Sequence, residues 1–161
     1  MKALTRYVEW KAIPIAGLAG GTAYLLLMLA LLPVTSGAQP VLMLRYFASL
    51  VMGQEVITQE SAASLVVGIL VHYVLSIFFA LVIAIVVHRW GMLVGIVGGA
   101  VLGLSFYGIN LYTMTLIFPW FFAMHGVLLA AAHVLYGAVA GGVYEIFDHY
   151  DEGLKPAGEV A

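Results

Sequence analysis

Two histidines, His72 and His133, are the residues of this chain best placed to do chemistry, because each lies inside a long apolar segment. An imidazole buried in lipid without a partner is costly, so such a residue is a functional candidate by default. Small residues flank both at helical spacing: Gly68 and Ser76 around His72, and Gly137 after His133. Because residues four apart share a helix face, we expect both rings to point into close helix contacts.

Three kinds of chemistry are compatible with this pair. The first is interhelical hydrogen bonding within a polar cluster. The candidate partners are Asn110, Ser105, Tyr73 and Tyr136. The second is bis-histidine ligation of a b-type haem by His72 and His133, since two histidines at similar depth on different helices are what a haem slot needs. The third is a proton or metal site.

A catalytic site is not expected. Cysteine is absent, which excludes thiolate catalysis and iron–sulfur ligation. None of the glycine-rich segments has the spacing of a phosphate loop with its lysine, and no nucleophile has a positioned base. We therefore expect no enzyme, no dedicated metal site, and no firmly bound cofactor apart from the haem b alternative.

The composition makes lipid the solvent of this chain. Of its 161 residues 64% are hydrophobic and 9% are charged, whereas a soluble domain carries about 25% charged residues. Four apolar segments reach the about 20 residues that a span needs, and the backbone must satisfy its own hydrogen bonds in lipid, so we expect helices. They are expected at about 10–32, 62–87, 92–118 and 120–146. The predicted fold is a single all-α domain, 1–161, with four transmembrane helices in a bundle.

The basic residues predict the orientation. Five of the six fall on one side of the four expected spans, and Arg45 alone falls on the other. The five are Lys2, Arg6, Lys11, Arg89 and Lys155. Since positive charge is retained on the cytoplasmic side, we expect a multi-pass protein of the bacterial inner membrane with both termini, and the tail 147–161, in the cytoplasm.

The loop 34–61 should lie outside. Its middle, 40–52, is apolar but too short to span, and Arg45, Ser49 and Gly53 form a polar stripe along it. We expect a short amphipathic helix on the outer leaflet or against a partner.

The spacing of glycines and histidines in the two halves of the chain predicts a tandem repeat of two helices. The glycines recur at equal spacing near the start of the first and third helices, and a second histidine follows sixteen residues after each intramembrane histidine, at His88 and His149. Such halves would have the same orientation, as in parallel repeats of transporters. Glycines let helices approach closely in lipid. The residues expected to do so are Gly20, Gly21, Gly98, Gly99 and Gly137.

These motifs resemble small uncharacterised bacterial four-helix membrane proteins with G-x-x-G-G and H-x-x-x-G helix motifs. The matching residues are Gly17, Gly20 and Gly21, then Gly95, Gly98 and Gly99, then His133 and Gly137. The first half departs from the pattern, since Ser76 stands where the glycine after His72 would be. Such families have no known activity, so the resemblance implies a fold and no function.

Function is expected to be that of a non-enzymatic accessory or assembly subunit of a larger membrane complex, a respiratory or redox complex being one candidate. A small haem-b cytochrome or anchor is the alternative, and a small permease or channel is the second alternative. The expected partners are membrane lipid and other membrane-protein subunits or further copies of the chain. The net charge of −2 gives no reason to expect nucleic acid.

Overall fold

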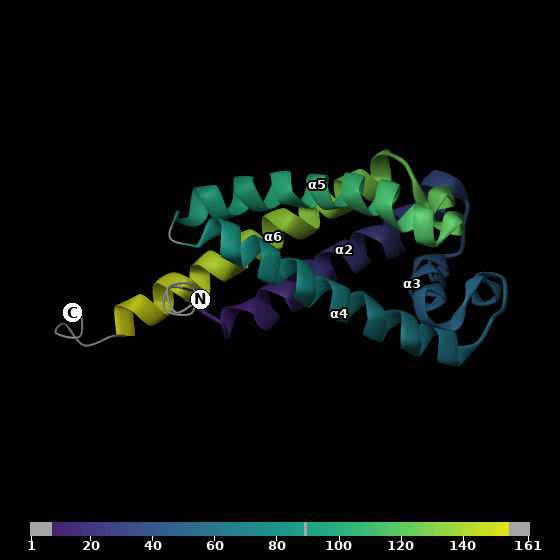
Figure 1. Ribbon diagram of the computed structural model, residues 1–161, viewed down its shortest axis with the longest axis horizontal. Coiled ribbons are helices and arrows are strands. Elements are labelled where there is room, and N and C mark those ends of the chain that lie inside the picture. Colours follow the sequence, from purple (N-terminus) through teal and green to yellow (C-terminus); the bar gives the residue numbers. More distant parts are fainter. Residues whose placement is uncertain (1–7, 89, 155–161) are drawn as a thin grey trace.

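The computed structural model describes residues 8–88 and 90–154, with 149–154 described by backbone alone. Within these residues every regular element is helical, as predicted. Four helices are long and apolar enough to cross a membrane. They are α2 (Ala12–Ser36), α4 (Ala62–Val87), α5 (Met92–Ile117) and α6 (Val127–Leu154) (Figure 1). The candidate span within α6 is Val127–Asp148.

Three short elements gather at one end of these helices. They are α3 (Leu42–Met52) and the 3₁₀ helices η1 (Gln54–Ile57) and η2 (Pro119–Met124). We call this the α3 end. The start of α2 and the end of α6 lie at the opposite end (Figure 1). Lys11 is therefore at one end and Arg45 at the other, as the orientation requires. The other basic residues used for that prediction, Lys2, Arg6, Arg89 and Lys155, fall outside the described residues.

The first helix continues past the proline that was expected to end it. Pro33 lies inside α2, in its last turn, and Ser36 is the last helical residue. Proline lacks an N–H but keeps its carbonyl, and the Pro33 carbonyl accepts the N–H of Gly37 at 2.9 Å. Gly37 has φ 70°, the left-handed conformation common just after a helix. The stop signal is therefore Gly37.

The fourth helix begins later than expected, at Val127 instead of about residue 120. Residues 119–124 form η2, and Gly126 has φ 137°, which no helix can include. The N–H of Gly126 is held by the Tyr107 hydroxyl at 3.0 Å. His133 is thus six residues inside its helix, or about 9 Å along the axis, compared with ten residues, or about 15 Å, for His72 in α4.

Helices α5 and α6 pack backbone to backbone through glycines. A Cβ built on Gly99 would overlap the carbonyl of Gly137, one on Gly103 would overlap that of His133, and one on Gly141 would overlap that of Gly95. Lipid gives helices no hydrophobic reason to associate, so this close approach supplies the van der Waals contact that holds them. Gly98 does not take part. It faces the Val87 side chain of α4, which a Cβ would meet at 3.4 Å.

The helix contacts follow the correspondence that the repeat predicts. Gly21 of α2 lies against Ser76 of α4, and their counterparts, Gly99 of α5 and Gly137 of α6, also meet. Helices of different halves are also in contact: Gly20 of α2 lies against Tyr136 of α6. Its counterpart, the contact between α5 and α4, is much sparser than the one between α2 and α6. The contact between the two helices of one half thus resembles that in the other half, whereas the two contacts between the halves differ.

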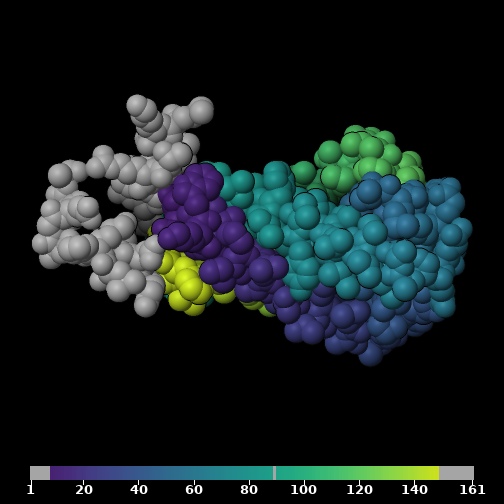
Figure 2. Space-filling model, turned by 90° about the horizontal axis from the view of Figure 1, so that it is seen from below, coloured from purple at the N-terminus to yellow at the C-terminus, as the bar shows by residue number. Residues whose placement is uncertain are grey.

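The polar stripe of α3 turns toward the protein instead of facing water. Arg45 and Ser49 are 7% and 1% exposed, and the Trp120 indole N–H donates to Ser49 Oγ at 2.9 Å. On the neighbouring helix Gly68 has no side chain, so the Leu44 backbone lies directly on α4. The segment 37–61 between α2 and α4 therefore folds back as a cap on the α3 end, where it forms one continuous surface with α4 (Figure 2).

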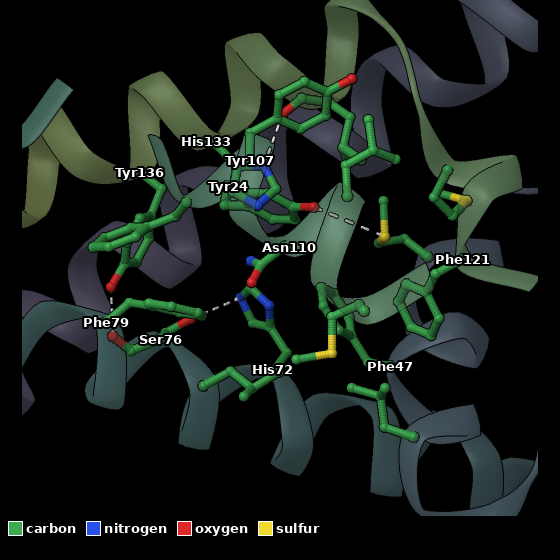
Figure 3. Close-up of a pocket in the computed structure, with 18 residues that line it drawn as sticks. Tyr24, Phe47, His72, Ser76, Phe79, Tyr107, Asn110, Phe121, His133 and Tyr136 are labelled. Atoms are coloured by element: carbon green, nitrogen blue, oxygen red, sulfur yellow. Dashed lines mark hydrogen bonds between the residues drawn. The ribbon is translucent and has the colours of Figure 1, made fainter. Parts of the chain in front are cut away.

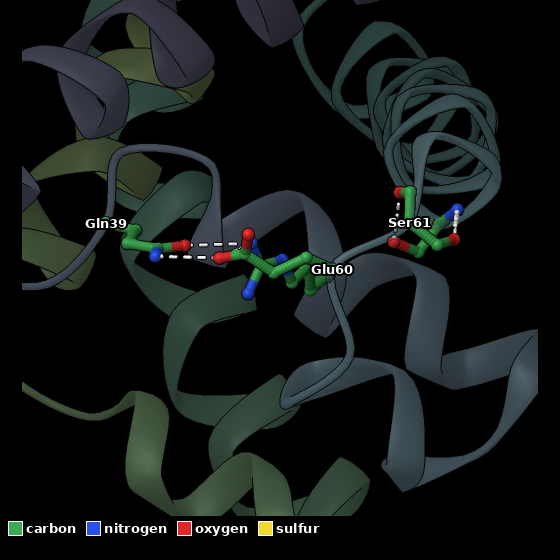
Figure 4. A network of polar contacts seen from close by, with 5 residues as sticks. Gln39, Glu60 and Ser61 are labelled. Atoms are coloured by element: carbon green, nitrogen blue, oxygen red, sulfur yellow. Dashed lines mark hydrogen bonds and ion pairs between the residues drawn. The ribbon is translucent and has the colours of Figure 1, made fainter.

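A polar clasp fastens this cap. The Arg45 guanidinium donates through Nη2 to Glu60 Oε1 at 3.1 Å and to Gln39 Oε1 at 2.8 Å, and Gln39 Nε2 donates to the same Glu60 oxygen at 2.9 Å (Figure 4). Hydrogen bonds from Gln39 and from Arg45, together with the charge of Arg45, hold the pKa of Glu60 below its usual value. The clasp ties the segments on both sides of α3 to α3 itself.

Candidate functional site

A cavity of about 120 Å³ lies between the helices, in the half of the spans nearest the α3 end (Figure 3). Most of its wall is apolar, with Phe47 of α3, Phe79 of α4 and Phe106 of α5 among the lining residues. The polar wall includes both intramembrane histidines. The polar lining residues are Tyr24, His72, Ser76, Tyr107, Asn110, His133 and Tyr136. An apolar cavity with a few convergent polar groups is the usual form of a small-molecule site.

His72 is held by the backbone of α2. Its Nε2 lies 2.9 Å from the Gly21 carbonyl oxygen and 3.4 Å from Ser76 Oγ. A carbonyl only accepts, so we assign the proton of the neutral ring to Nε2 and a lone pair to Nδ1. Gly21 permits this bond because it has no side chain between the two helices. No described residue bonds to Nδ1 of His72.

His133 is held within its own helix. Its Nδ1 lies 2.8 Å from the carbonyl oxygen of Leu129, one turn earlier in α6. By the same reasoning Nδ1 carries the proton, and Nε2 has a lone pair that no described residue engages. The two histidines thus present one acceptor nitrogen each, and these are different atoms of the ring.

Tyr24 of α2 joins the two imidazoles. Its ring centroid lies 5.4 Å from that of His72 and 5.2 Å from that of His133, and the residue is 4% exposed. Its hydroxyl has one weak acceptor, Met43 Sδ of α3 at 3.9 Å. The structure therefore brings the two histidines to one region, around a residue that was not predicted. The available signal was a phenol in the middle of the first apolar run, three residues after Gly21.

The expected polar cluster is present in composition but differs in its bonds. Asn110 and Tyr136 both line the cavity, yet Tyr136 donates to the Ser76 carbonyl at 2.5 Å, and the Asn110 amide makes no hydrogen bond to a described residue. Neither bonds to an imidazole. Of the other candidates, Tyr73 pairs with Thr22 at 2.9 Å, and Ser105 donates to the carbonyl of Val101 in its own helix.

Haem ligation does not fit this arrangement. A cavity of about 120 Å³ is below the roughly 300–1,000 Å³ of pockets for drug-sized ligands, and a porphyrin is a large planar ligand. We derive no chemistry through haem, and haem b stays a prediction that a spectrum tests. The described residues also contain no group of three His, Asp or Glu side chains placed to hold a metal ion.

The four apolar spans place the chain in the class of multi-pass membrane proteins. No family model, no curated protein and no solved structure matches the chain.

Proposed function

We propose that this chain is a non-enzymatic accessory subunit of a larger bacterial inner-membrane complex, and that its cavity receives a small molecule from the lipid phase. The observation that supports this best is the cavity itself, which lies within the spans and has two imidazoles, an amide and three phenols in its wall. An intramembrane ionisable side chain is expensive, and it marks a functional site by default.

The accessory role is supported by how few of the described residues lie outside the four apolar helices and the cap. Four residues, 88–91, link α4 to α5, and the longest loop folds back as the cap. Such a molecule has hardly any aqueous surface for chemistry of its own, so its contacts lie within the membrane. The termini are proposed to be cytoplasmic, with the α3 end outside, because the basic residues favour that orientation.

Native mass spectrometry of the protein extracted in mild detergent tests both parts of the proposal. We expect a stoichiometric assembly with membrane-protein subunits, and a small lipid-soluble molecule that stays with the chain. Leu111→Trp should displace this molecule because Leu111 lines the cavity. The matched control is Leu116→Trp on the same helix, where the side chain is 84% exposed. A chain that is always alone would refute the accessory role, and one that never retains a small molecule would refute the cavity's role.

A further inference from the structure

The cavity wall carries polar atoms that the protein itself leaves without good partners. They are Nδ1 of His72, Nε2 of His133 and the amide of Asn110, none of which bonds to a described residue. The Tyr24 hydroxyl has only a thioether acceptor. Unpaired polar groups are costly away from water, and each one in a native structure calls for an explanation. A ligand with complementary groups would supply one.

The cavity wall includes half-buried residues of α4 and α5, such as Leu75 and Leu111. These two helices are sparsely packed against each other, and side chains of both reach the outer surface of the bundle, which lipid covers. Toward the α3 end it is closed by residues of α3 and η2, including Phe47 and Phe121 (Figure 3). A ligand therefore enters from the bilayer, between α4 and α5, and must be soluble there.

The size of the cavity limits the ligand to one ring. Its volume of about 120 Å³ is close to the roughly 150 Å³ of an engineered apolar cavity that holds benzene. Aromatic residues form much of the wall, with Phe79 and Phe106 at 4.6 Å between ring centroids and Phe47 at 4.8 Å from His72. Aromatic rings favour such neighbours in offset or edge-to-face contact.

The tautomers of His72 and His133 determine which hydrogen-bonding groups the bound ring must carry. Both free imidazole nitrogens are acceptors, so they call for donors on the ligand. A hydrocarbon chain would leave these nitrogens unpaired, while ring hydroxyls would pair them. Both histidines line the cavity and contact the same Tyr24 ring, at 5.4 and 5.2 Å between ring centroids, so a ring bound in the cavity has both imidazoles in the surrounding wall.

We propose that the cavity binds the ring of a lipid-soluble hydroquinone. Its hydroxyl groups donate to Nδ1 of His72 and Nε2 of His133, the Asn110 amide contacts the ring substituents, and the apolar tail leaves between α4 and α5. The proposal concerns binding alone, and it rests on the proposed function because it names the molecule that the cavity receives.

Calorimetry in lipid nanodiscs with three matched probes tests it. The probes are prenylhydroquinone, prenylbenzoquinone and prenylbenzene, which share a skeleton and differ in their oxygens. We expect the wild-type protein to bind prenylhydroquinone about tenfold or more tightly than prenylbenzene, the scale of one or two net hydrogen bonds. The quinone should lie between them, because its oxygens accept only from the Asn110 amide and the Tyr24 hydroxyl.

Variants locate the preference. Asn110→Leu and His133→Phe should each reduce the preference for prenylhydroquinone over prenylbenzene about fivefold, the loss of one hydrogen bond. Asn110 is half-buried, so Asn110→Leu keeps the test valid if a histidine variant fails to fold. Tyr112→Phe is the control, since Tyr112 is 76% exposed two residues further along α5 and should change no affinity.

Each outcome separates the two proposals. A preference for prenylhydroquinone that the cavity variants reduce supports both. Equal binding of all three probes overturns the hydroquinone assignment and leaves the cavity as a site for apolar molecules. If no probe binds, both proposals about the cavity are overturned. A preference that Tyr112→Phe abolishes, with the cavity variants unchanged, would place the hydroquinone elsewhere and also overturn the assignment.

Discussion

Gly99 of α5 and Gly137 of α6 lie with their backbones in reciprocal contact: a Cβ on either residue would overlap the carbonyl of the other. Their counterparts in the first half are Gly21 and Ser76, where the serine side chain fills part of the same space. The second half is therefore the more tightly joined pair, and its stability depends on these two positions having no side chain.

We predict that Gly99→Ala destabilises the protein in detergent. Alanine is a better helix former than glycine by about 1 kcal/mol, but its methyl group would meet the Gly137 carbonyl, and overpacking costs about 1–3 kcal/mol. The net effect should be a lower midpoint of thermal unfolding, and Gly137→Leu should lower it further. The matched control is Gly108→Ala on the same helix, where a Cβ meets nothing within 4 Å; its midpoint should not fall. Equal behaviour at both sites would mean that the glycine contact is not stabilising.

The orientation predicts a labelling pattern, which is clean because the chain has no cysteine. Single cysteines at Lys2 or Gly158 should react with an impermeant maleimide only from the cytoplasmic side, and a cysteine at Gln54, an exposed residue of η1, only from outside. The reason is the positive-inside rule. Arg45 is the only basic residue expected outside, at the α3 end, and the other five are expected on the cytoplasmic side. Labelling of Gln54 from the cytoplasm would reverse the orientation.

The clasp around Arg45 predicts that the cap loosens at low pH. The pKa of Glu60 is lowered in the folded protein. The stabilisation by its carboxylate is therefore present above the unfolded pKa of about 4.3, and it is lost as the pH falls through the lower folded pKa. The protection of residues 42–52 against hydrogen exchange, corrected for the intrinsic exchange rate at each pH, should therefore fall below about pH 4. Because Glu60 is exposed, the effect is expected to be modest.

Glu60→Gln should remove most of this pH-dependent loss of protection and lower the protection of 42–52 at neutral pH, because Arg45 is buried and loses its counter-charge. Glu55→Gln serves as the control, since Glu55 is an exposed carboxylate of η1 with no ion pair to a described residue. An unchanged pH profile in Glu60→Gln would show that another group controls the cap.

The sequence predicts the elements of this fold better than their contacts. Apolar length defines α4 to the residue, since 62–87 is the helix observed. The start of α6 was misjudged because residues 119–124 are as apolar as a span, and only the positive φ of Gly126 separates them from it. A hydrophobicity pattern does not detect such a break. The sequence does contain a glycine at this point, directly after a histidine.

The site was predictable in part. His72 and His133 stand out because ionisable groups are rare in lipid, and they do meet the same ring. Their hydrogen-bond partners did not follow from the sequence, because both rings bond to backbone carbonyls, which every residue carries. Tyr24 escaped notice since a tyrosine in an apolar run suggests the membrane interface, while its depth depends on where α2 crosses α4.

Replacing either histidine by alanine should lower the stability of the protein, by different amounts for the two. His72 bonds to another helix, so His72→Ala should lower stability by about 1 kcal/mol, the usual scale of interhelical hydrogen bonds in membranes. His133 bonds within its own helix, so His133→Ala should cost less through hydrogen bonding and act mainly through lost ring contacts with Tyr24 and Tyr107. His125→Ala, at an exposed residue in the turn before Gly126, is the control and should not change stability measurably.

Protein purified from haem-sufficient cells should show no Soret band, because a cavity of about 120 Å³ has no room for a porphyrin. A Soret band that either alanine variant removes would show that the helices around Tyr24 open to admit haem, and the haem-b alternative would then replace the hydroquinone site.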